Sequence, residues 1–243
     1  MGQLDGKIAL VTGSSRGIGK AIAIAFAKEG ASLVLAARTV AGLNATAKAI
    51  KALGRDVEVV PTDVKIEPQI DNLFKKTLER FGRLDILVNN AGIFTGGPID
   101  KISTEDWDNV IATNLRAPFL CTRAAFGIMK AQGGGRIINI GSISAQRVRS
   151  NNAPYSCAKF ALVGLTHTIA LEGREYNINC GILHPGLALP EEIRNRGGGP
   201  PGEASMTLEE IAAAAVYMAC QPPHVNVLEL IQLPRDQLYL GRG

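Results

Sequence analysis

The chain alternates short apolar runs with longer segments in which apolar residues recur at helical spacing. The short runs are continuous, without alternation between apolar and polar positions, which is typical of strands in a parallel sheet that helices cover on both faces. The sequence therefore predicts an α/β fold built on one doubly wound parallel sheet of about seven strands. The expected strands are Lys7–Thr12, Leu33–Ala37, Val57–Pro61, Asp85–Asn89, Arg136–Ile140 and Ile178–His184, with a short seventh strand near Val225–Gln232.

The segments between these runs predict helices that cover the sheet. Ser103 and Thr207 are candidate N-caps, because each precedes a helical pattern and an acidic residue follows soon after. The expected helices are Gly17–Glu29, Val40–Leu53, Pro68–Phe81, Thr104–Ala131, Pro154–Tyr176 and Leu208–Cys220.

Length and composition favour a single domain over residues 1–243, since 243 residues with 46% hydrophobic content suffice for one full core. The one Gly/Pro-rich stretch, Arg196–Gly202, predicts a mobile substrate loop around residues 187–205. The longest strongly apolar run, Ile211–Cys220, is about half of the ~20 residues that span a bilayer. The N-terminus resembles neither a signal peptide nor a lipidation motif, so we expect a cytoplasmic protein.

The net charge and the cysteine pattern give little support for a nucleic-acid-binding protein, a metal site or a disulfide scaffold. The net charge of +4 comes from 26 basic and 22 acidic residues spread along the chain, which gives little support for nucleic-acid binding. The four cysteines, Cys121, Cys157, Cys180 and Cys220, match neither a metal pattern nor a disulfide scaffold. We expect reduced, mostly buried thiols and no metal site.

A glycine-rich turn, Thr12-Gly13-Ser14-Ser15-Arg16-Gly17-Ile18-Gly19, joins the first predicted strand to the first helix. Glycines allow a ligand to approach the backbone closely, and the N-terminus of the helix offers free N–H groups and a positive dipole to a pyrophosphate. Tight turns need glycine for other reasons, but this position in a doubly wound chain favours a dinucleotide site.

Further polar residues follow the later strands, where ligands of such sheets bind. Asn89-Asn90-Ala91-Gly92 follows the fourth strand, and Ser142 follows the fifth. Tyr155 and Lys159 are spaced i, i+4 and share one face of a helix. Together with Asn114, this ordered set resembles the short-chain dehydrogenase/reductase family from Lys7 to about Gly186. Within that family, T-G-S-S-R-G-I-G, I-I-N-I-G-S-I-S and Y-S-C-A-K look most like members of the 3-oxoacyl-(acyl carrier protein) reductase type.

The resemblance implies a Rossmann-type nucleotide-binding fold and a role for each matching residue. Tyr155 would be the acid/base, Ser142 would polarise the substrate oxygen, Lys159 would hold the nicotinamide ribose and tune Tyr155, and Asn114 would belong to a proton relay. Asp63 matches the family's adenine-contacting acid, although a loop or capping aspartate is the alternative. The cofactor site that the resemblance implies comprises Gly13, Ser15, Arg16, Gly17, Ile18, Gly19, Arg38, Asp63, Val64, Asn90, Ala91, Gly92, Tyr155, Lys159, Pro185 and Gly186.

A simple electrostatic argument supports the Tyr155–Lys159 pair. Lowering a tyrosine pKa by two to three units requires roughly 3–4 kcal/mol. One ammonium at ~4–5 Å supplies about that amount at an effective dielectric constant near 20. The pair is thus expected to work without a metal ion.

The end of the second strand bears on the choice of cofactor. Members of the family that prefer NAD place an acid at the position of Ala37 for the ribose 2′-hydroxyl. Here the acid is missing, Arg38 follows directly, and Arg16 lies in the glycine turn. This combination resembles members that hold the 2′-phosphate of NADP, so NADP(H) is favoured over NAD(H).

Two segments depart from the family's pattern. The stretch after the sixth strand, Pro185 to Pro190, lacks the usual Thr that meets the nicotinamide carboxamide, leaving backbone groups near Leu187 for that contact. The segment Asn226–Gly243 lacks the glycine-rich ending common in carrier-protein reductases. The substrate is therefore left open.

Other polar residues have no assigned function in the sequence. His167, His184 and His224 are expected to be structural or surface residues. Arg147 and Arg149 are either solvated loop charges or contacts for an anionic substrate.

The favoured function is an NADP(H)-dependent oxidoreductase that passes hydride between nicotinamide and a small-molecule carbonyl or secondary alcohol. The alternatives are an NAD-dependent sugar, polyol or steroid alcohol dehydrogenase, and a non-catalytic NADP-sensing protein. No nucleic-acid or membrane partner is expected. Apolar faces on two helices predict a homodimer or homotetramer that pairs them across a two-fold axis. These faces comprise Ala124, Ala125 and Ile128 on one helix and Leu162, Val163, Leu165 and Ile169 on the other.

Overall fold

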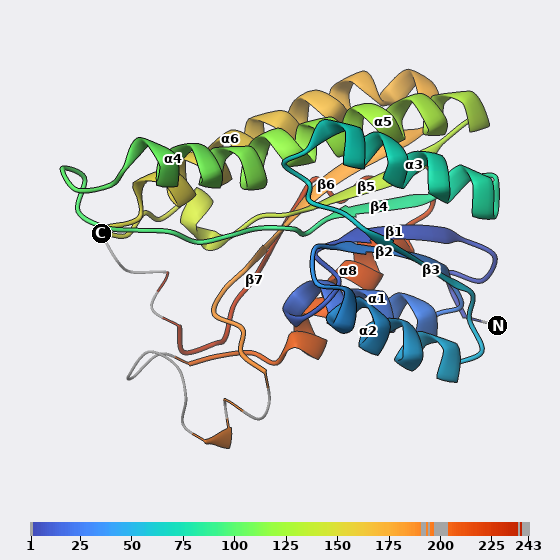
Figure 1. The fold of residues 1–243 in the computed structure, drawn as a ribbon, viewed down its shortest axis with the longest axis horizontal. Helices are drawn as coiled ribbons and strands as arrows, with labels where there is room; N and C mark the ends of the chain where they lie inside the picture. Colours follow the sequence, from blue (N-terminus) through green and yellow to red (C-terminus); the bar gives the residue numbers. More distant parts are fainter. Residues whose placement is uncertain (1, 191–192, 194, 197–203, 238, 240–243) are drawn as a thin grey trace.

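A computed structural model of the chain describes residues 2–190, 193, 195–196, 204–237 and 239. Its centre is one parallel sheet of seven strands in the order β3-β2-β1-β4-β5-β6-β7 (Figure 1), so the predicted fold class is confirmed. Most of the predicted substrate loop lies outside the described residues. The strands are β1 (Ile8–Thr12), β2 (Ser32–Ala37), β3 (Val57–Pro61), β4 (Ile86–Asn89), β5 (Gly135–Ile140), β6 (Ile178–Pro185) and β7 (Glu229–Gln232).

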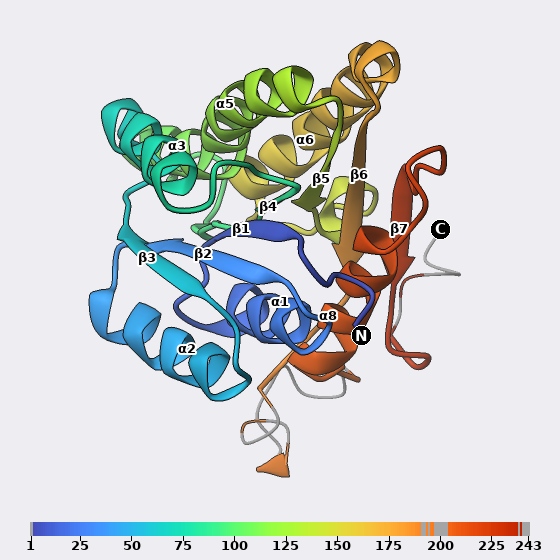
Figure 2. The ribbon, with the colours of Figure 1, turned by 90° about the vertical axis from the view of Figure 1, so that its right-hand side faces the viewer.

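Helices cover the two faces of the sheet, as Figure 2 shows with the sheet between two helical layers. One layer consists of α1 (Gly17–Lys28), α2 (Val40–Ala52) and α8 (Leu208–Ala219). The other consists of α3 (Glu67–Phe81), α4 (Thr104–Ile111), α5 (Ala117–Gln132) and α6 (Ala153–Glu172). Each layer packs its own apolar cluster against the sheet, and most strand residues between the layers are fully buried. This explains why the strands show no alternation.

The predicted helix Thr104–Ala131 is wrong as a single element. A π-helical segment, Ala112–Arg116, separates α4 from α5. Pro118 lies in the first turn of α5 and has no N–H for the carbonyl of Asn114, and its ring would clash with that carbonyl in a continuous α-helix. The wider turn accommodates the proline. Ser103 caps α4 as predicted, since its hydroxyl accepts the Asp106 N–H, and Thr207 caps α8 with a complete capping box.

The predicted helix Pro154–Tyr176 is too long. Helix α6 ends at Glu172, and a 3-10 turn, Arg174–Tyr176, leads to Asn177 in the left-handed region. The chain returns sharply to β6 here, and a Cβ on Gly173 would lie 2.3 Å from the Ile178 carbonyl oxygen.

The seventh strand exists but is shorter than the predicted Val225–Gln232. Before Glu229, the Asn226 side chain donates to the Cys180 carbonyl in place of a backbone ladder bond. Other ends of the predicted strands and helices differ from the structure by at most one residue, and β3 agrees at both ends.

The cysteines are less uniformly buried than expected. Cys121 and Cys180 are buried, but Cys157 is exposed and Cys220 is partly exposed. Burial raises the pKa of the Cys121 thiol to about 12. Among the described residues no group of His, Cys, Asp and Glu could hold a metal ion. No helix in the same residues has the length and apolar character needed to cross a bilayer.

Candidate active site

The glycine turn between β1 and α1 is shaped for an anion. Gly13 and Gly17 have φ values of 68° and 57°, which favour glycine. Helix α1 starts at Gly17 without a side-chain cap from Arg16 and without an acidic residue in its first turn. A Cβ on Gly19 would lie 2.5 Å from the Gly13 carbonyl oxygen, so only glycine fits this close packing. The free N–H groups and the helix dipole both favour negative charge here.

The Thr12 hydroxyl joins the ends of β1 and β4. It donates to the Val88 carbonyl (3.3 Å) and accepts the N–H groups of Asn90 (3.0 Å) and Ala91 (3.1 Å). The Asn90 amide donates in turn to the carbonyl oxygens of Thr12 (2.8 Å) and Gly13 (3.3 Å). The Asn90 side chain is thus engaged within the protein, and no pattern in the sequence indicated the part played by Thr12.

A cleft of about 750 Å³ opens beyond the carboxyl ends of the strands. It brings together most of the predicted cofactor residues, and Gly19 packs directly behind the turn. Pro185, Gly186, Tyr155 and Lys159 do not line this cleft. The predicted residues that do are Gly13, Ser15, Arg16, Gly17, Ile18, Arg38, Asp63, Val64, Asn90, Ala91 and Gly92. Residues not foreseen include Thr39, Gly42, Ile93, Ala188 and Leu208.

Two exposed arginines and one buried alanine form the part of the cleft next to β2. Ala37 is buried at the end of β2, while Arg16 and Arg38 are exposed and make no ion pair within the described part of the chain. Asp63, in the same cleft, accepts the Lys65 N–H at 3.0 Å and is half-buried. Two cations are therefore available where family members bind the adenosine ribose.

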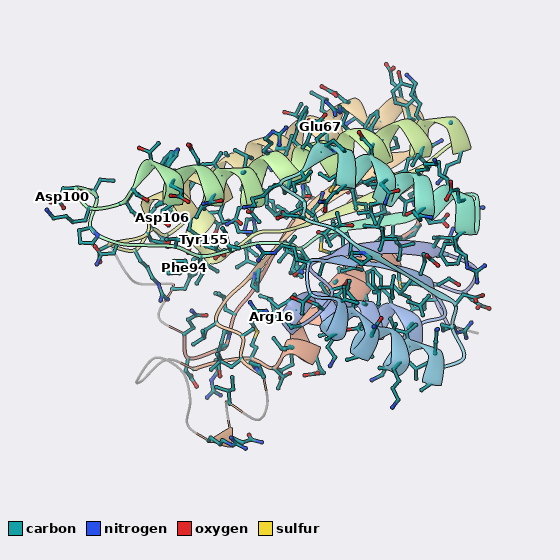
Figure 3. All side chains as sticks on the ribbon, in the orientation of Figure 1. Arg16, Glu67, Phe94, Asp100, Asp106 and Tyr155 are labelled. Atoms are coloured by element: carbon teal, nitrogen blue, oxygen red, sulfur yellow. The ribbon has the colours of Figure 1, made fainter. Side chains whose placement is uncertain are left out.

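Ser142 and Tyr155 meet beside this cleft. Ser142 lies two residues after the end of β5, and its hydroxyl accepts the Ser144 N–H at 3.1 Å. Tyr155 lies in the first turn of α6 and is hydrogen-bonded to Ser142. Figure 3 shows Tyr155 and Phe94 close together, on the same side of the molecule as Arg16. The rings of Phe94 and Tyr155 meet edge to face with centroids 5.5 Å apart.

Lys159 lies one turn after Tyr155 on the same face of α6. Its Nζ lies 5.5 Å from the centroid of the Tyr155 ring and donates to the Ile140 carbonyl at 2.7 Å. Burial lowers the pKa of Lys159 to about 8.

The pKa of Tyr155 differs from the expected direction. Burial raises it above its usual value of 10, and the hydrogen bond with Ser142 lowers it to a smaller extent. The lowered pKa was expected from the attraction of the Lys159 ammonium alone. The desolvation of both groups has to be added to that attraction. In this structure the ammonium is also engaged with a backbone carbonyl.

Asn114 lies inside the π-helical segment and fastens the loop after β4. Its Oδ1 accepts the Ile93 N–H at 2.9 Å, and its Nδ2 donates to the Ile93 carbonyl at 2.8 Å. Short π-helical turns are frequent at functional sites. Here the turn places an amide against the loop that carries Asn90 to Phe94.

The segment after β6 is organised by the C-terminal part of the chain. The Leu187 N–H donates to Gln237 Oε1 at 3.0 Å, and the Leu187 carbonyl accepts the Met206 N–H. The backbone of Ala188, between these contacts, lines the cleft. The N–H and the carbonyl of Leu187 are thus both hydrogen-bonded. No pattern of residues in the sequence indicated the contact with Gln237.

His184 lies directly behind Ser142. It is fully buried, and its Nδ1 is 2.9 Å from the Ser142 carbonyl oxygen and 3.3 Å from the Ser142 nitrogen. The sequence predicted that His184 is a structural or surface residue. The burial agrees with that, and the contact with Ser142 was not foreseen.

A second cavity, of about 310 Å³, lies at the opposite end of the sheet. The charged groups of this cavity already have partners. Asp85 forms ion pairs with Lys7 and Arg83 and accepts the Ile8 N–H. Arg136 donates to three backbone carbonyls. Such paired groups stabilise the fold and leave little for a ligand.

Comparison with known proteins shows the family to which the chain is related. The short chain dehydrogenase family model matches residues 7–196. A 3-oxoacyl-[acyl-carrier-protein] reductase of Synechocystis is 36% identical over 228 residues, which cover 91% of this chain and 92% of that protein. A metagenomic short-chain oxidoreductase crystallised with NADP is 33% identical, with a TM-score of 0.84 over 96% of this chain and 98% of that one. An alcohol dehydrogenase from Thermococcus sibiricus, in complex with 5-hydroxy-NADP, is 30% identical, with a TM-score of 0.85 over 93% and 95% of the two chains.

The order of the parallel strands, with a cleft beyond their carboxyl ends, defines a protein of the Rossmann-like α/β class. Within that class, the chain belongs to the short-chain dehydrogenase/reductase family. It is an oxidoreductase that acts on CH–OH groups with NAD(P), and its substrate is a small molecule.

Proposed function

We propose that the chain is an NADP(H)-dependent oxidoreductase that interconverts a carbonyl and a secondary alcohol, with Tyr155 as the acid/base. The observation that carries this proposal is the meeting of Ser142, Tyr155 and Lys159 at the end of β5, beside a cleft with an uncapped helix N-terminus. The two relatives crystallised with NADP or 5-hydroxy-NADP add support.

The residues of the cleft fit a dinucleotide. The first turn of α1 would hold the pyrophosphate, and Arg16 and Arg38 would hold the 2′-phosphate. Asp63 and Val64 would contact the adenine, and the backbone of Asn90, Ala91 and Gly92 would line the adjoining ribose. The N–H and the carbonyl of Leu187 are already hydrogen-bonded within the protein. The backbone of Ala188, the next residue, would therefore contact the nicotinamide carboxamide. Pro185 and Gly186 would act by carrying that segment.

When bound, the nicotinamide supplies or accepts the hydride. The Tyr155 hydroxyl donates its proton to the substrate oxygen in reduction, and the Tyr155 phenolate takes the proton back in oxidation. The Ser142 hydroxyl orients that oxygen against Tyr155, and Lys159 places its ammonium under the same ring. Asn114 is hydrogen-bonded to the backbone of the loop that borders the site, and this position supports its proposed role in a proton relay.

The test compares Tyr155→Phe with Tyr217→Phe, an exposed tyrosine on α8. NADPH oxidation is followed by absorbance against a panel of ketones, and NADPH binding is followed by fluorescence. Tyr155→Phe should lower turnover by about 10²–10⁴-fold with NADPH binding nearly unchanged, because only the proton donor is lost. Equal turnover in the two variants would contradict the role of Tyr155. Tight NADPH binding without reduction of any ketone would favour a sensor.

We also propose that the chain forms a homodimer or homotetramer through α5 and α6. Of the seven apolar residues named for this contact, Ala125, Leu162 and Ile169 are buried within the chain itself and cannot contribute. Ala124, Ile128, Val163 and Leu165 are half-buried, and Phe119 and Phe160 on the same two helices are 45% and 47% exposed. Burial of this surface favours association.

Light scattering across a dilution series, run beside an activity assay, tests the assembly. We expect a species of two or four chains whose dissociation lowers activity, because α6 also carries Tyr155 and Lys159. A species of monomer mass with full activity would contradict the proposal.

A further inference from the structure

His184 contacts the one catalytic candidate that lies outside the α- and π-helices, since Ser142 caps only a short 3-10 turn, Ile143–Ala145. Ser142 lies two residues after the end of β5, and its backbone reaches His184 at the end of the neighbouring strand β6. The His184 side chain has no exposed surface, and its Nδ1 lies 2.9 Å from the Ser142 carbonyl oxygen and 3.3 Å from the Ser142 nitrogen. The ring is therefore close enough to fix the orientation of the Ser142 peptide.

This contact depends on the residue before Ser142 being glycine. A Cβ on Gly141 would lie 2.6 Å from His184 Nδ1. The Gly141 N–H donates to the Leu183 carbonyl at 2.7 Å, which keeps the two strand ends in register. On the other side, Lys159 Nζ donates to the Ile140 carbonyl. The end of β5 is thus held between Lys159 and His184.

One ring nitrogen cannot serve both Ser142 atoms in the same state. A protonated Nδ1 donates to the carbonyl oxygen, whereas an unprotonated Nδ1 accepts the N–H. The other nitrogen, Nε2, lies 3.7 Å from Glu229 Oε2 on β7, and it has no hydrogen-bond partner within the described residues. Glu229 Oε1 lies 2.7 Å from His167 Nε2 on α6. At 3.7 Å the Glu229 carboxylate lies beyond hydrogen-bond reach of Nε2, whereas Nδ1 is close enough to the Ser142 carbonyl oxygen to donate to it, so the geometry favours the tautomer that carries its proton on Nδ1.

The environment of His184 favours the neutral ring. Burial lowers its pKa, and the nearby Lys159 acts in the same direction. Glu229 and the hydrogen bond with Ser142 act in the opposite direction and are smaller than the effect of burial. A hydrogen bond that raises the pKa is one that the ring donates, so the neutral ring carries its proton on Nδ1 and donates it to the Ser142 carbonyl.

We propose that His184 is a positioning residue for Ser142, in which the neutral ring donates its Nδ1 proton to the Ser142 carbonyl oxygen. The kinetic part of this inference rests on the proposed function. The arrangement turns the Ser142 hydroxyl toward Tyr155 by fixing its backbone. Protonation of His184 in acid adds a positive charge and a proton at Nε2 facing Glu229, which draws the ring toward β7 and away from the Ser142 peptide.

The tautomer can be measured directly, without any substrate. The chain has three histidines, and a His184→Asn variant identifies the His184 signals in the ¹⁵N NMR spectrum of the imidazole rings. We expect the wild type at neutral pH to carry the proton on Nδ1, and the Ser142 amide signal to shift as His184 titrates. A proton on Nε2, or a Ser142 amide that does not respond to the titration, would falsify the proposal.

Two substitutions separate positioning from packing. Asn places a polar atom where Nδ1 lies, whereas Gln places one where Nε2 lies. We expect His184→Asn to keep kcat within about threefold of the wild type and His184→Gln to lower it about tenfold or more, with KM and NADPH binding little changed. The fall of kcat toward acid pH should also be weaker in His184→Asn.

His167→Asn, which changes only the exposed partner of Glu229, is the matched control and should leave kcat unchanged. Equal losses in His184→Asn and His184→Gln would reduce His184 to a packing role. If the wild type reduces no ketone, the proposed function fails, while the tautomer and the Ser142 amide shift still decide this inference.

Discussion

The two ends of the sheet use charged residues in opposite ways. At the amino ends of the strands, Asp85 is 7% exposed and is engaged by Arg83, Lys7 and the Ile8 N–H. At the carboxyl ends, Arg16 and Arg38 are exposed and make no ion pair with any described residue. Each end has a cavity lined by charges, so a cavity alone does not identify a site. What distinguishes the two ends is whether the charges are already neutralised.

The same contrast applies to the backbone. Arg136 is buried at the amino end, and its guanidinium satisfies the carbonyls of Gln221, Pro222 and Val225. At the carboxyl end, the first turn of α1 has neither a side-chain cap nor an acidic neighbour. An unsatisfied backbone group costs free energy unless water or a ligand binds it. The uncapped end is therefore where a bound anion gains most.

The largest expected effect comes from the two arginines of the cleft. The double substitution Arg38→Asp with Arg16→Gln should weaken NADPH binding by at least about 10–150-fold, the equivalent of one lost charge-assisted bond, and shift preference toward NADH. Titration of each nucleotide by fluorescence measures this. Lys51→Gln, an exposed change on α2, serves as the control for net charge. Equal NADPH affinity in the wild type and the double variant would place the 2′-phosphate elsewhere.

A comparable effect, on stability instead of affinity, is expected from Lys159, the buried cation at the carboxyl end. Burial lowers its pKa from 10.5 to about 8, so between about pH 8 and pH 10.5 the unfolded chain binds a proton that the folded chain has lost. The free energy of unfolding of the wild type should therefore rise relative to that of Lys159→Met over this window, by about 3 kcal/mol in total. Urea unfolding of both proteins at several pH values checks this. Taking the difference cancels the titration of Cys121 and Cys180. A constant difference would contradict the lowered pKa.

The smallest effect is expected at the amino end. Asp85→Asn should lower the free energy of unfolding by about 2 kcal/mol, because the amide replaces a charge bonded to Arg83 and to the Ile8 N–H. Nucleotide affinity should stay the same. The control Asp56→Asn breaks an exposed pair with Arg80 and should cost less than about 1 kcal/mol. A loss of NADPH binding in Asp85→Asn would break the division between the two ends.

The parts of the molecule that follow local rules could be predicted from the sequence. The strands were recognisable because both faces of the sheet are buried, and the glycine turn because its φ values and close contacts require glycine. Eleven of the predicted cofactor residues line one cleft because they sit on loops after parallel strands, which meet at one edge of the sheet.

The parts that depend on contacts across long sequence separations could not be predicted. The break in the predicted helix at Ala112–Arg116 needs the backbone geometry around Pro118, and the tie between Leu187 and Gln237 joins residues 50 positions apart. The direction of the Tyr155 pKa shift requires its burial to be known. The contact between His184 and Ser142 could not be predicted, because a single histidine in an apolar strand is usually a buried structural residue.

The shared Thr12 hydroxyl has a consequence for how the protein folds. Its partners Asn90 and Ala91 lie 78 and 79 residues further along the chain, so these bonds form only when β4 docks on β1. Closing so long a loop is slow compared with forming local helices, and parallel sheets fold late for that reason. Nucleotide can therefore bind only chains that have completed this pairing. By mass action, bound cofactor would draw partly folded chains toward the native state and protect them from proteolysis.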